Sequence, residues 1–480
     1  MKSKSLLDYE QFHLMGIKGV AMTGLAQCLI DAGKKVTGSD VAEDFVTAPL
    51  LKKLDLEIQT SFHDPLPKGT ECVIYTSAHQ SQDNPQVVLA KNSGLPTLTH
   101  AEALGELFNL QSGVAVCGVG GKSSTSGMLA WITEQLQPSS FAVGVGEIIN
   151  LPTTAHFRKD SQWFIAEADE YVTDPSAPQK GEEITPRFSF LKPQIIVATN
   201  LKFDHPDVYR DLDHAKSTYI KFFQQLKPNG ALVYNADDEQ LSELSMKLKS
   251  QRNDVKLLSF GQDSSADYRL HTRKTQDKQQ HISVLLPTQK NHTLTLKVPG
   301  HFNVQNALAA LAATQAMNLD LAKVTDALAS FSSTKRRFEL IGEKAGVAYY
   351  DDYAHHPSEV AAAIAAIQEW CPEQRVVVVF QPHTFTRTKQ LFTEFVAALK
   401  TAPELILFKI FASAREAFDP NVTVDQLATT IKNQQADFPV STFHAMDKLA
   451  DYLQLTLAPR AIKPSKCLSR DLVPILSPPG

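Results

Sequence analysis

The sequence predicts an α/β protein of several domains, in which parallel sheets are covered by helices on both faces. Three observations predict it. Short apolar segments alternate with helix-compatible segments through most of the 480 residues. A chain of this length corresponds to two to four domains of roughly 100–200 residues each. Hydrophobic residues make up 43% and charged residues 21% of the chain, which is the balance of a globular protein with real cores.

The strand-like segments form three groups along the chain. The first group consists of FHLMG, KKVTGSD and CVIYTSA, the second of VAVCG, WFIAEAD, QIIVATN and ALVYNAD, and the third of RVVVVFQPH and LILFKIF. Strand, turn and helix in alternation are typical of parallel sheets. Residues 262–300 instead alternate polar with apolar side chains, which predicts a small antiparallel hairpin set inside the middle domain.

Two boundaries separate these groups. The first group closes with the helix-like segment HAEALGELFNL, before the strand that begins near Val114. The second boundary follows LAKVTDALASF near Phe331, where an alanine-rich helical stretch gives way to TKRRFEL and a new strand. The predicted domains are therefore residues 1–110, 111–331 and 332–480.

Composition and charge exclude several classes of protein. The net charge of −5 gives no general electrostatic reason to expect nucleic acid as a partner. The N-terminus has no apolar core long enough for a signal peptide, and no stretch approaches the ~20 apolar residues of a membrane-spanning helix. The five cysteines are scattered and form no CxxC pair, which argues against disulfides and zinc. We expect a cytoplasmic protein, monomeric or weakly dimeric, that binds neither nucleic acid nor membranes.

The first glycine loop lies in HLMGIKGVAMTGLAQCL, where Gly16, Gly19 and Gly24 separate a strand from a helix. The dinucleotide pattern GxGxxG fails, because Lys18 occupies the second glycine position. Backbone amides at this helix start can still hold a diphosphate, and Asp40 ends the next strand, where an acidic residue can accept hydrogen bonds from a ribose. A tight turn whose glycines serve helix packing explains the loop equally well.

A second glycine loop, AVCGVGGKSSTSGM, is stronger evidence for phosphate binding. Only two residues separate Gly118 from Gly121, whereas four precede the Gly-Lys pair in the common nucleotide-binding loop. Glycines permit positive φ, so successive amides can form an anion-binding nest at the helix start. Lys122 would reach the outer phosphates, and the Ser123 hydroxyl would bind Mg²⁺. The alternative, a glycine turn with a solvated lysine, is weakened because strand, glycines, Gly-Lys-Ser and helix all coincide.

Acidic residues follow two later strands. WFIAEADEY provides Glu167, Asp169 and Glu170, and alternation along a strand would put Glu167 and Asp169 on the same face. TNLKFDHPDVY adds His205 between two aspartates. A carboxylate run is usually a solvated surface. These runs, however, lie where strand ends enter loops, which is where open α/β sheets bind ligands, and Mg²⁺ prefers oxygen ligands.

The last domain carries the motifs YYDDYAHHPSEV and FQPHTFTRT. The adjacent His355 and His356 do not predict zinc, because there is no HExxH motif and no cysteine nearby. Arg387 and the basic residues 335–337 could hold phosphate or carboxylate. Each of them alone would be read as a surface base with a long apolar stem.

Together these motifs resemble those of the Mur ligases, the ATP-dependent amino-acid ligases of peptidoglycan synthesis. The loop GVGGKSST is similar to the family's GTHGKTTT, and GIKGVAMTGLA is similar to its GIGGxGMSGLA. VIYTSAHQSQDNP, EADEY, TNLKFDHPD, GHFNVQNALAA, RRFE, DDYAHHP and FQPHTFTRT recur in the family's order, up to about residue 455. An ordered set of motifs is much more specific than any one loop.

Three departures from the family pattern stand out. Val119 and Gly120 replace Thr-His in the phosphate loop, and Ser123 replaces the usual threonine but keeps the hydroxyl. Residues 172–188 are longer than expected of the alanine-adding members and somewhat resemble the related ligase that recycles murein tripeptide. The family usually ends with a strand and a GAGDI-like loop. Residues 460–480 show neither pattern, so we expect them to pack poorly.

The resemblance implies a fold and a reaction. It implies a Rossmann-like N-terminal domain for a UDP-sugar, a central P-loop ATPase-like parallel sheet with a small antiparallel insert for ATP, and a Rossmann-like C-terminal domain that contacts amino acid and nucleotide. ATP would phosphorylate the lactyl carboxylate of UDP-N-acetylmuramate, and the amine of L-alanine would attack the acyl phosphate. ATP and Mg²⁺ are the implied cofactors.

Four alternatives remain open at this point. Free tripeptide could replace L-alanine as the amine. A non-catalytic UDP-sugar-binding protein would keep the first loop without turnover. A hydride-transfer enzyme would explain only the first glycine loop, and a nucleotide kinase would explain only the second.

The resemblance also implies binding residues. The expected UDP-sugar contacts are Gly16, Ile17, Lys18, Gly19, Ser39, Asp40 and Ser77. The expected ATP contacts are Gly118, Val119, Gly120, Gly121, Lys122, Ser123, Ser124, Asn303, Asn306, Arg337, Asp352 and His356. The expected metal ligands are Ser123, Glu167 and His205.

The implied catalytic residues are Lys122, His205, Lys216 and Arg387. By family analogy, His205 takes part in a second metal site close to the acyl phosphate, and Lys216 lies near the position that some Mur ligases carbamylate. His383 and Arg387 would hold the carboxylate of the incoming amino acid through a charge-assisted fork.

Overall fold

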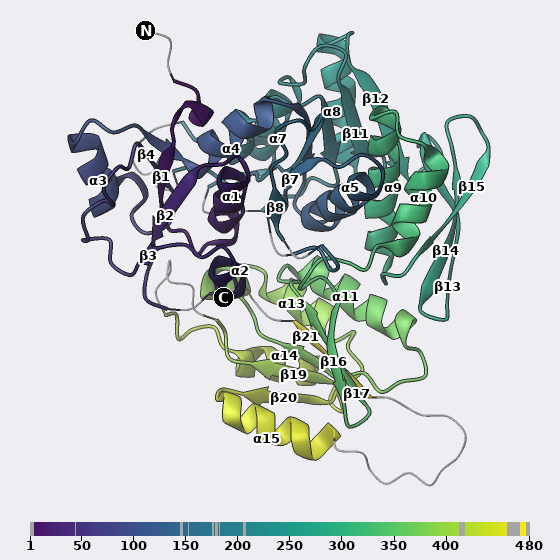
Figure 1. Cartoon of the computed structure of the whole chain (residues 1–480). Coiled ribbons are helices and arrows are strands. Elements are labelled where there is room, and N and C mark those ends of the chain that lie inside the picture. The colour runs from purple at the N-terminus through teal and green to yellow at the C-terminus, as the bar shows by residue number, and fades with distance from the viewer. Residues whose placement is uncertain are drawn as a thin grey trace. The chain divides into compact units, whose positions relative to one another are not determined.

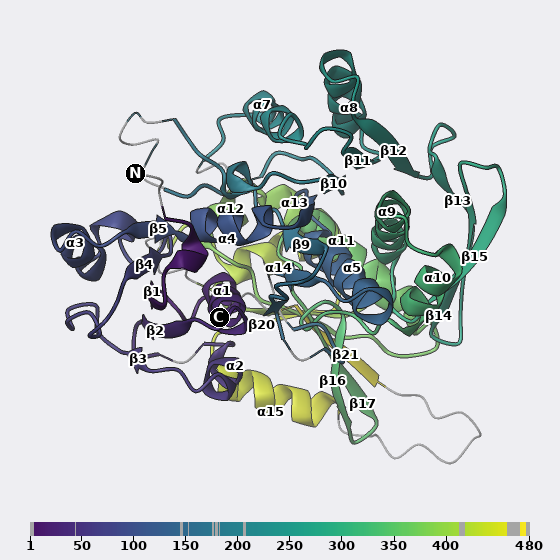
Figure 2. The same cartoon turned by 45° about the horizontal axis from the view of Figure 1, so that its top comes forward.

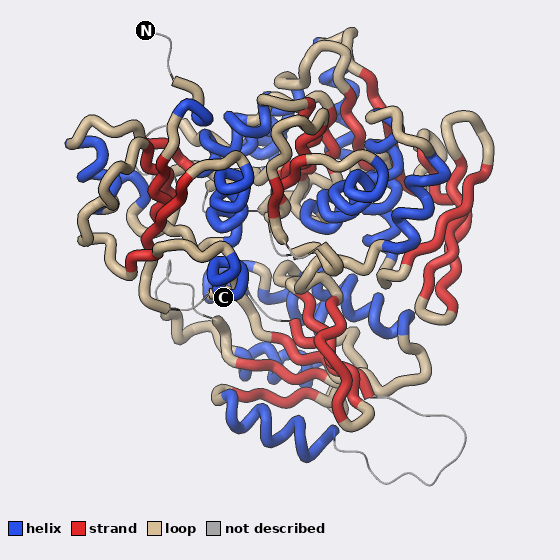
Figure 3. The backbone as a smooth tube through the Cα atoms, in the orientation of Figure 1, coloured by secondary structure: helices blue, strands red, loops and turns tan. Residues whose placement is uncertain are grey.

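The chain forms three β-sheets with helices between the strands (Figures 1 and 3). The computed structural model describes residues 4–43, 45–144, 147–151, 153–174, 177, 181, 183–204, 208–411 and 418–457, together with the backbone of one strand at 471–476. These residues make two compact units. The first unit comprises Met1–Arg273, Ile282–Thr295 and Gln305–Ser332, and the second comprises Lys274–His281, Leu296–Val304 and Ser333–Gly480.

The first sheet has the order β3-β2-β1-β4-β5, and all of its strands run parallel. Its strands are β1 (Gln11–Met15), β2 (Lys35–Ser39), β3 (Ile58–Gln59), β4 (Cys72–Tyr75) and β5 (Thr97–Thr99). The helices between them are α1 (Val20–Asp31), α2 (Ala48–Lys53), α3 (Pro85–Asn92) and α4 (His100–Asn109). The strand order reverses between β1 and β4, and ligands of open α/β sheets bind at such a switch point.

The second sheet has ten strands in the order β15-β14-β13-β12-β11-β10-β6-β9-β7-β8. They are β6 (Ser112–Cys117), β7 (Ser140–Ala142), β8 (Ala155–His156), β9 (Trp163–Glu167), β10 (Ile195–Ala198), β11 (Ala231–Asn235), β12 (Lys256–Gly261), β13 (Tyr268–Gln276), β14 (Gln279–Leu285) and β15 (Asn291–Leu296). From β7 through β9, β6, β10, β11 and β12 to β13 the neighbours are parallel. Their carboxyl ends therefore meet at one edge.

The predicted hairpin set at 262–300 is confirmed, and it extends the second sheet rather than standing apart from it (Figure 1). Strand β12 pairs with β13 through two residue pairs, Phe260 with Tyr268 and Gly261 with Arg269. The turn between β13 and β14 has positive φ at Asp277 and Lys278, as a two-residue hairpin turn requires.

Helices cover the second sheet. They are α5 (Lys122–Leu136), α7 (Leu212–Phe223), α8 (Glu239–Gln251), α9 (His301–Ala316) and α10 (Leu321–Ser330). Helices α5 and α10 lie side by side in both views (Figures 1 and 2), and the Trp131 indole of α5 donates a hydrogen bond of 3.0 Å to the Ala327 carbonyl of α10.

One apolar core runs through both sheets of the first unit. It includes Leu14 of β1, Leu25 of α1, Ala115 of β6 and Phe164 of β9, all fully or almost fully buried. A Cβ at Gly105 of α4 would lie 2.7 Å from the Phe190 Cβ, so a glycine is needed where α4 packs against the segment that precedes β10. The first sheet is thus packed firmly against the second.

The third sheet, in the second unit, has the order β16-β17-β21-β18-β19-β20. Its strands are β16 (Glu339–Lys344), β17 (Val347–Asp352), β18 (Val378–Phe380), β19 (Leu405–Phe408), β20 (Val440–Phe443) and β21 (Asp471–Leu476). Only the pair β16–β17 is antiparallel among the pairs of this sheet. Its helices are α11 (Pro357–Trp370), α12 (Phe385–Gln390), α13 (Phe392–Leu399), α14 (Val424–Gln434) and α15 (Met446–Leu457).

Strand β21 corrects one expectation from the sequence. We expected no strand after residue 460, yet residues 471–476 lie between β17 and β18 in the middle of the sheet. The segment DLVPIL contains Pro474, which has no N–H to donate and is unusual in a central strand. Every other strand-like segment named from the sequence forms a strand, so the predicted α/β class is confirmed. No helix in the described part of the chain has the length and apolarity needed to span a membrane.

Candidate functional site

The second glycine loop joins the end of β6 to the start of α5. Gly118 and Gly121 have φ of 131° and 85°. A Cβ at Gly118 would lie 2.2 Å from the Thr199 Oγ1, and one at Gly121 would lie 2.5 Å from the Asn306 Oδ1. Both the backbone conformation and the close neighbours therefore require glycine at these two positions.

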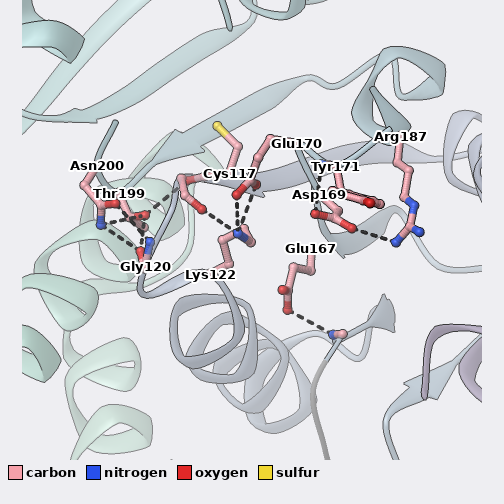
Figure 4. Close-up of polar contacts among 12 residues, drawn as sticks. Cys117, Gly120, Lys122, Glu167, Asp169, Glu170, Tyr171, Arg187, Thr199 and Asn200 are labelled. Carbon is pink, nitrogen blue, oxygen red and sulfur yellow. Dashed lines mark hydrogen bonds and ion pairs between the residues drawn. The ribbon is translucent and has the colours of Figure 1, made fainter. Parts of the chain in front are cut away.

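Two residues that follow β10 fasten this loop (Figure 4). The Gly120 amide donates to the Asn200 Oδ1 at 2.9 Å, and the Asn200 Nδ2 donates back to the Gly120 carbonyl at 2.8 Å. The Thr199 hydroxyl donates to the same carbonyl at 2.6 Å. Thr199 and Asn200 were missing from the residues expected from the sequence, although they open the motif TNLKFDHPD.

Lys122, the first residue of α5, is held beside the loop by Glu170. Its Nζ donates to the two Glu170 carboxylate oxygens at 2.9 and 3.0 Å and to the Gly118 carbonyl at 2.6 Å. Burial acts to lower the pKa of Lys122, but the carboxylates of Glu170, Asp169 and Glu167 outweigh it and hold this pKa above its ordinary value. Lys122 is therefore a fixed cation at neutral pH.

The three carboxylates after β9 have three different partners (Figure 4). Glu170, 3% exposed, is paired with Lys122. The Asp169 Oδ2 accepts from the Arg187 Nη1 at 2.8 Å. The Glu167 Oε2 accepts from the Gly144 amide at 3.0 Å. Because β9 ends at Glu167, strand alternation does not govern Asp169, and the two side chains do not share a strand face as we expected.

Ser123 and Glu167 fit the expected Mg²⁺ site. The Ser123 hydroxyl is 2% exposed and has no hydrogen-bond partner in the described part of the chain. A buried polar group without a partner costs about 1–3 kcal/mol, so the Ser123 hydroxyl has the chemistry of a group that a bound ligand would satisfy. Gly144 leaves room for the Glu167 carboxylate, since a Cβ there would lie 2.9 Å from the Glu167 Cδ. Hydroxyl and carboxylate oxygens are ligands that Mg²⁺ accepts.

The third expected metal ligand, His205, lies outside the described residues. Within the described ranges, no group of three or more His, Cys, Asp and Glu side chains is arranged to hold a metal ion.

The first glycine loop brings together most of the residues expected to contact a UDP-sugar. The amides of Gly16 and Ile17 donate to the Ser39 carbonyl at 2.8 and 3.2 Å. The Lys18 amide donates to the Asp40 Oδ2 at 2.7 Å, and the Lys18 Nζ donates to the carbonyls of residues 41–43. Lys18, in place of a glycine, thus joins the loop to the segment after β2.

Asp40, expected to accept hydrogen bonds from a ribose, already has partners within the protein. It is 1% exposed, and besides Lys18 it accepts a hydrogen bond from the Val41 amide at 2.8 Å. The His79 Nε2 lies 3.4 Å from its Oδ1. Asp40 therefore fixes the shape of the loop, and its role toward a ribose stays a prediction.

Ser77, expected at the UDP-sugar, lies beside the loop that follows β9, residues 168–172, which we call the acidic loop. Its Oγ accepts from the Arg187 Nη2 at 2.7 Å, while the other terminal nitrogen of Arg187 is bound to Asp169. No motif singled out Arg187, because it lies 18 residues from Asp169 and 110 residues from Ser77 in the chain.

In the second unit, Asp352 joins the RRFE and DDYA turns. Its carboxylate oxygens accept from the amides of Phe338 and Ala354, each at 2.9 Å. Burial raises the pKa of Asp352 to about 6. The Arg337 guanidinium lies 5.0 Å from the centre of the Tyr353 ring, and its Nε is buried with no partner in the described part of the chain.

His356 caps α11, where its side chain accepts from the Ser358 amide at 3.3 Å. It thus shapes the start of a helix, and the contact with nucleotide expected of it remains a prediction.

His383 and Arg387 lie together at the start of α12. The Arg387 Nη1 is 3.5 Å from the His383 Nδ1, and the His383 ring stacks on Phe411 with 5.5 Å between ring centres. Thr384 between them has φ of 71°, a conformation that costs about 1–3 kcal/mol in non-glycine residues and gathers at functional sites. The expected amino-acid-binding pair is therefore assembled in one place.

Two expected residues have local partners. The Lys216 Nζ on α7 forms an ion pair with Glu243 on α8, so the carbamylation considered for it stays a prediction. The Asn303 Nδ2 donates to the Pro299 carbonyl at 2.8 Å, whereas Asn306, one turn later on α9, lies against Gly121 of the phosphate loop.

Comparison with known families gives three matches along the chain. Residues 11–112 match the Mur ligase family catalytic domain, residues 116–314 the Mur ligase middle domain, and residues 336–462 the Mur ligase glutamate ligase domain.

Curated relatives cover nearly the whole chain. The UDP-N-acetylmuramate–L-alanine ligase of Geobacter sp. (strain M21) is 34% identical over 451 residues, which are 94% of this chain and 93% of that protein. The enzyme of the same name from Acetivibrio thermocellus is 34% identical over 456 residues, 91% of this chain and 90% of that protein.

Solved structures confirm the predicted three-domain fold. The UDP-N-acetylmuramate–alanine ligase of Thermotoga maritima has a TM-score of 0.75 at 24% identity and covers 97% of this chain and 95% of that one. A murein peptide ligase of Psychrobacter arcticus has a TM-score of 0.67 at 20% identity, with the same coverage.

Proposed function

This chain belongs to the Mur ligase family, and we propose that it joins L-alanine to the lactyl carboxylate of UDP-N-acetylmuramate while ATP is converted to ADP and phosphate. The observation that carries the ATP-dependent step is the loop after β6, where Lys122 is held as a cation beside a buried serine hydroxyl without a partner. The relatives with this activity in their names support the choice of substrates.

The chemistry explains why a phosphate loop serves a ligase. A carboxylate is a poor electrophile, because its carbonyl carbon carries little positive charge. When a carboxylate oxygen attacks the γ-phosphorus, ADP leaves and the acyl group gains a good leaving group. The amine nitrogen then attacks the acyl carbon, inorganic phosphate leaves, and the nitrogen loses a proton. The protein's task is mainly to position the reactants and neutralise charge.

Lys122 supports the first step. Its contacts with Glu170 and the Gly118 carbonyl hold the Nζ beside the glycine loop, and arriving phosphate oxygens would take over some of these contacts. Ser123 and Glu167 would hold Mg²⁺, which when bound neutralises phosphate charge. Asn200 and Thr199 keep the loop in shape through Gly120.

The other substrates would use separate loops. The first glycine loop, fixed by Asp40 and Lys18, leads into α1, whose first backbone amides would bind the diphosphate of the UDP-sugar. Arg387 and His383 would hold the carboxylate of L-alanine and leave its amine free to react. The cytoplasmic location and the monomeric or weakly dimeric state stay predictions.

The test offers purified full-length protein UDP-N-acetylmuramate, ATP and Mg²⁺ with L-alanine, glycine, L-serine or free tripeptide, and measures phosphate release and product mass. We expect L-alanine to support turnover best. A pocket distinguishes one methylene by only about 1–3 kcal/mol, so glycine should react more slowly rather than not at all. Turnover with tripeptide alone would reassign the amine. Binding of the UDP-sugar without any product would contradict ligase activity.

A further inference from the structure

The segment between the acidic loop and η3 (Arg187–Phe190) has two arms that pair with each other. Val172 bridges to Pro186 in antiparallel fashion, and the Thr173 amide donates to the Thr185 carbonyl at 3.0 Å. The Arg187 amide then donates to the Tyr171 carbonyl at 2.8 Å. The outgoing arm, which begins at Tyr171, and the returning arm, which ends at Arg187, are therefore hydrogen-bonded to each other.

Buried aromatic packing anchors the end of the returning arm. Phe188, 1% exposed, stacks on Phe222 of α7 with 4.4 Å between ring centres and meets Tyr219 edge-on. The Phe190 carbonyl accepts from the Asn109 Nδ2 of α4 at 2.9 Å. The backbone of Arg187 is thus held by helices that cover both sheets of the first unit.

From this fixed backbone the Arg187 side chain reaches two loops at once. One terminal nitrogen donates to Asp169 and the other to Ser77, at 2.8 and 2.7 Å, distances that are typical of charge-assisted hydrogen bonds. The guanidinium lies 5.4 Å from the centre of the Tyr171 ring, and the Tyr171 amide donates to the second oxygen of Asp169. Figure 4 shows Arg187 and Asp169 beside Glu167 and Glu170.

Each of these two partners adjoins a candidate binding loop. Ser77 follows Thr76, whose Cγ2 would lie 2.4 Å from a Cβ at Gly16 in the first glycine loop. Asp169 precedes Glu170, the partner of Lys122. The Arg187 guanidinium therefore connects the segment beside the first glycine loop with the acidic loop beside Lys122.

We propose that Arg187 is a positioning residue that couples the loop expected at the UDP-sugar to the acidic loop of the ATP site, so that binding of UDP-N-acetylmuramate orders the acidic loop before phosphoryl transfer. This rests on the proposed function. The described arms of this segment, residues 172–174 and 183–188, then serve as the strut that holds Arg187 in place.

Hydrogen exchange tests the coupling in the full-length protein without ATP. UDP-N-acetylmuramate should slow exchange of residues 76–79 and 168–172 in the wild type. In Arg187→Met, which keeps an apolar stem but loses the fork, residues 168–172 should exchange about fivefold faster and lose their response to the UDP-sugar, since about fivefold is the lower end of coupling between sites. The matched control is Arg158→Met, because Arg158 is 27% exposed against 25% for Arg187 and also joins two groups, Glu134 and the Ser139 carbonyl.

Ligand binding and kinetics give a second measurement. A residue with only a structural role would not change the coupling between the two ligands. In the wild type, UDP-N-acetylmuramate should tighten the Kd of a non-hydrolysable ATP analogue about fivefold, and Arg187→Met should abolish this effect while each ligand alone binds nearly as before. kcat should fall more than the KM for ATP rises. Arg187→Lys should restore part of the coupling, because lysine keeps the charge but not the fork.

The outcomes separate the two proposals. Equal coupling and equal exchange in wild type and Arg187→Met would overturn the role of Arg187, whatever the activity. Faster exchange of residues 168–172 in Arg187→Met without ligand, in a protein that shows no turnover with UDP-N-acetylmuramate, would support the strut and overturn the proposed function.

Discussion

At the scale of single residues, we expect phosphoryl transfer at the second glycine loop to depend on Lys122. We expect Lys122→Ala to lower the rate of ADP release strongly while binding of UDP-N-acetylmuramate persists, because the charge expected to face the transferring phosphoryl group is lost. Contacts of this kind are worth roughly 2.7–4 kcal/mol, so the rate should fall by about 10²–10³-fold. A coupled ADP assay and calorimetry with the UDP-sugar measure the two effects. Near-normal ADP release would remove the loop from the mechanism.

Gly118 allows a prediction that depends only on the shape of the second glycine loop. Gly118→Ala places a Cβ 2.2 Å from the Thr199 Oγ1, so the loop must shift and the affinity for an ATP analogue should fall at least tenfold, about 1.4 kcal/mol. The matched control is Gly94→Ala, which also has positive φ, 70°, but meets nothing within 4 Å. It should cost about 1–2 kcal/mol of stability through backbone strain and leave nucleotide binding unchanged. Equal loss of affinity in both variants would contradict the argument.

His13 of β1 allows a prediction about pH. It is fully buried, and its Nε2 lies 3.3 Å from the Ser39 Oγ and from the Gln86 Oε1. Burial lowers the pKa of His13 to about 4, although its hydrogen bond with Gln86 acts to raise it. Because the folded pKa lies below the ordinary 6.5, the contribution of the neutral ring to stability is complete above pH 6.5 and is lost progressively as the pH falls from about 6.5 through about 4.

Urea unfolding of the wild type and His13→Gln between pH 4 and 7 checks this. The difference in stability should shrink toward low pH by up to about 3 kcal/mol, since one unit of pKa shift corresponds to about 1.4 kcal/mol. A difference that does not change with pH would show that His13 is not buried in its neutral form.

At the scale of elements, β21 gives the sharpest prediction. It lies between β17 and β18, so removing residues 460–480 leaves two strands without their shared neighbour. We expect the truncated protein to lose the protease resistance of the second unit and its ligase activity, while the first unit remains folded. Limited proteolysis with mass spectrometry measures this. A truncated protein with unchanged resistance and activity would restore the expectation drawn from the sequence.

The elements also show what the sequence could and could not predict. Apolar segments of four to six residues, such as those of β6 and β10, were visible because burial on both faces demands them. Strand β21 was missed because Pro474 interrupts a short apolar segment. Strands β3 and β8 have two residues each and carry no periodic signal.

Some residues of the candidate site could likewise be predicted from the sequence, and others could not. Lys122 and Ser123 were predicted because a glycine loop at a helix start is a local pattern. The partners of the carboxylates were not predicted, because Lys122 and Glu170 are 48 residues apart and Arg187 and Ser77 are 110 apart. Such pairs depend on which strands become neighbours in the sheet, and spacing along the chain does not record that.

At the scale of the whole molecule, the expected ligand contacts divide between the two units. All expected UDP-sugar contacts belong to the first unit, whereas Arg337, Asp352 and Arg387 belong to the second. We therefore expect UDP-N-acetylmuramate alone to stabilise the first unit against heat and leave the second unchanged. At a ligand concentration of 100 times the Kd, the gain is about 2.7 kcal/mol.

The three tryptophans make this measurable. Trp131 and Trp163 lie in the first unit, and Trp370 lies in the second. A variant with Trp131→Phe and Trp163→Phe reports the second unit by fluorescence, and Trp370→Phe reports the first. Only the Trp370→Phe protein should show a higher transition temperature with the UDP-sugar. An equal rise in both proteins would contradict independent stabilisation.

The shared apolar core of the first unit has a consequence for recombination between relatives. Leu14 and Leu25 from the first sheet and Ala115 and Phe164 from the second belong to one packed interior. A chimaera that exchanges residues 1–110 would place foreign side chains on one half of that interior, and volume mismatches in such interiors are costly. A crossover near residue 332 leaves it intact. Shuffled libraries of such ligases should therefore yield folded proteins when the first two sheets are inherited from one parent.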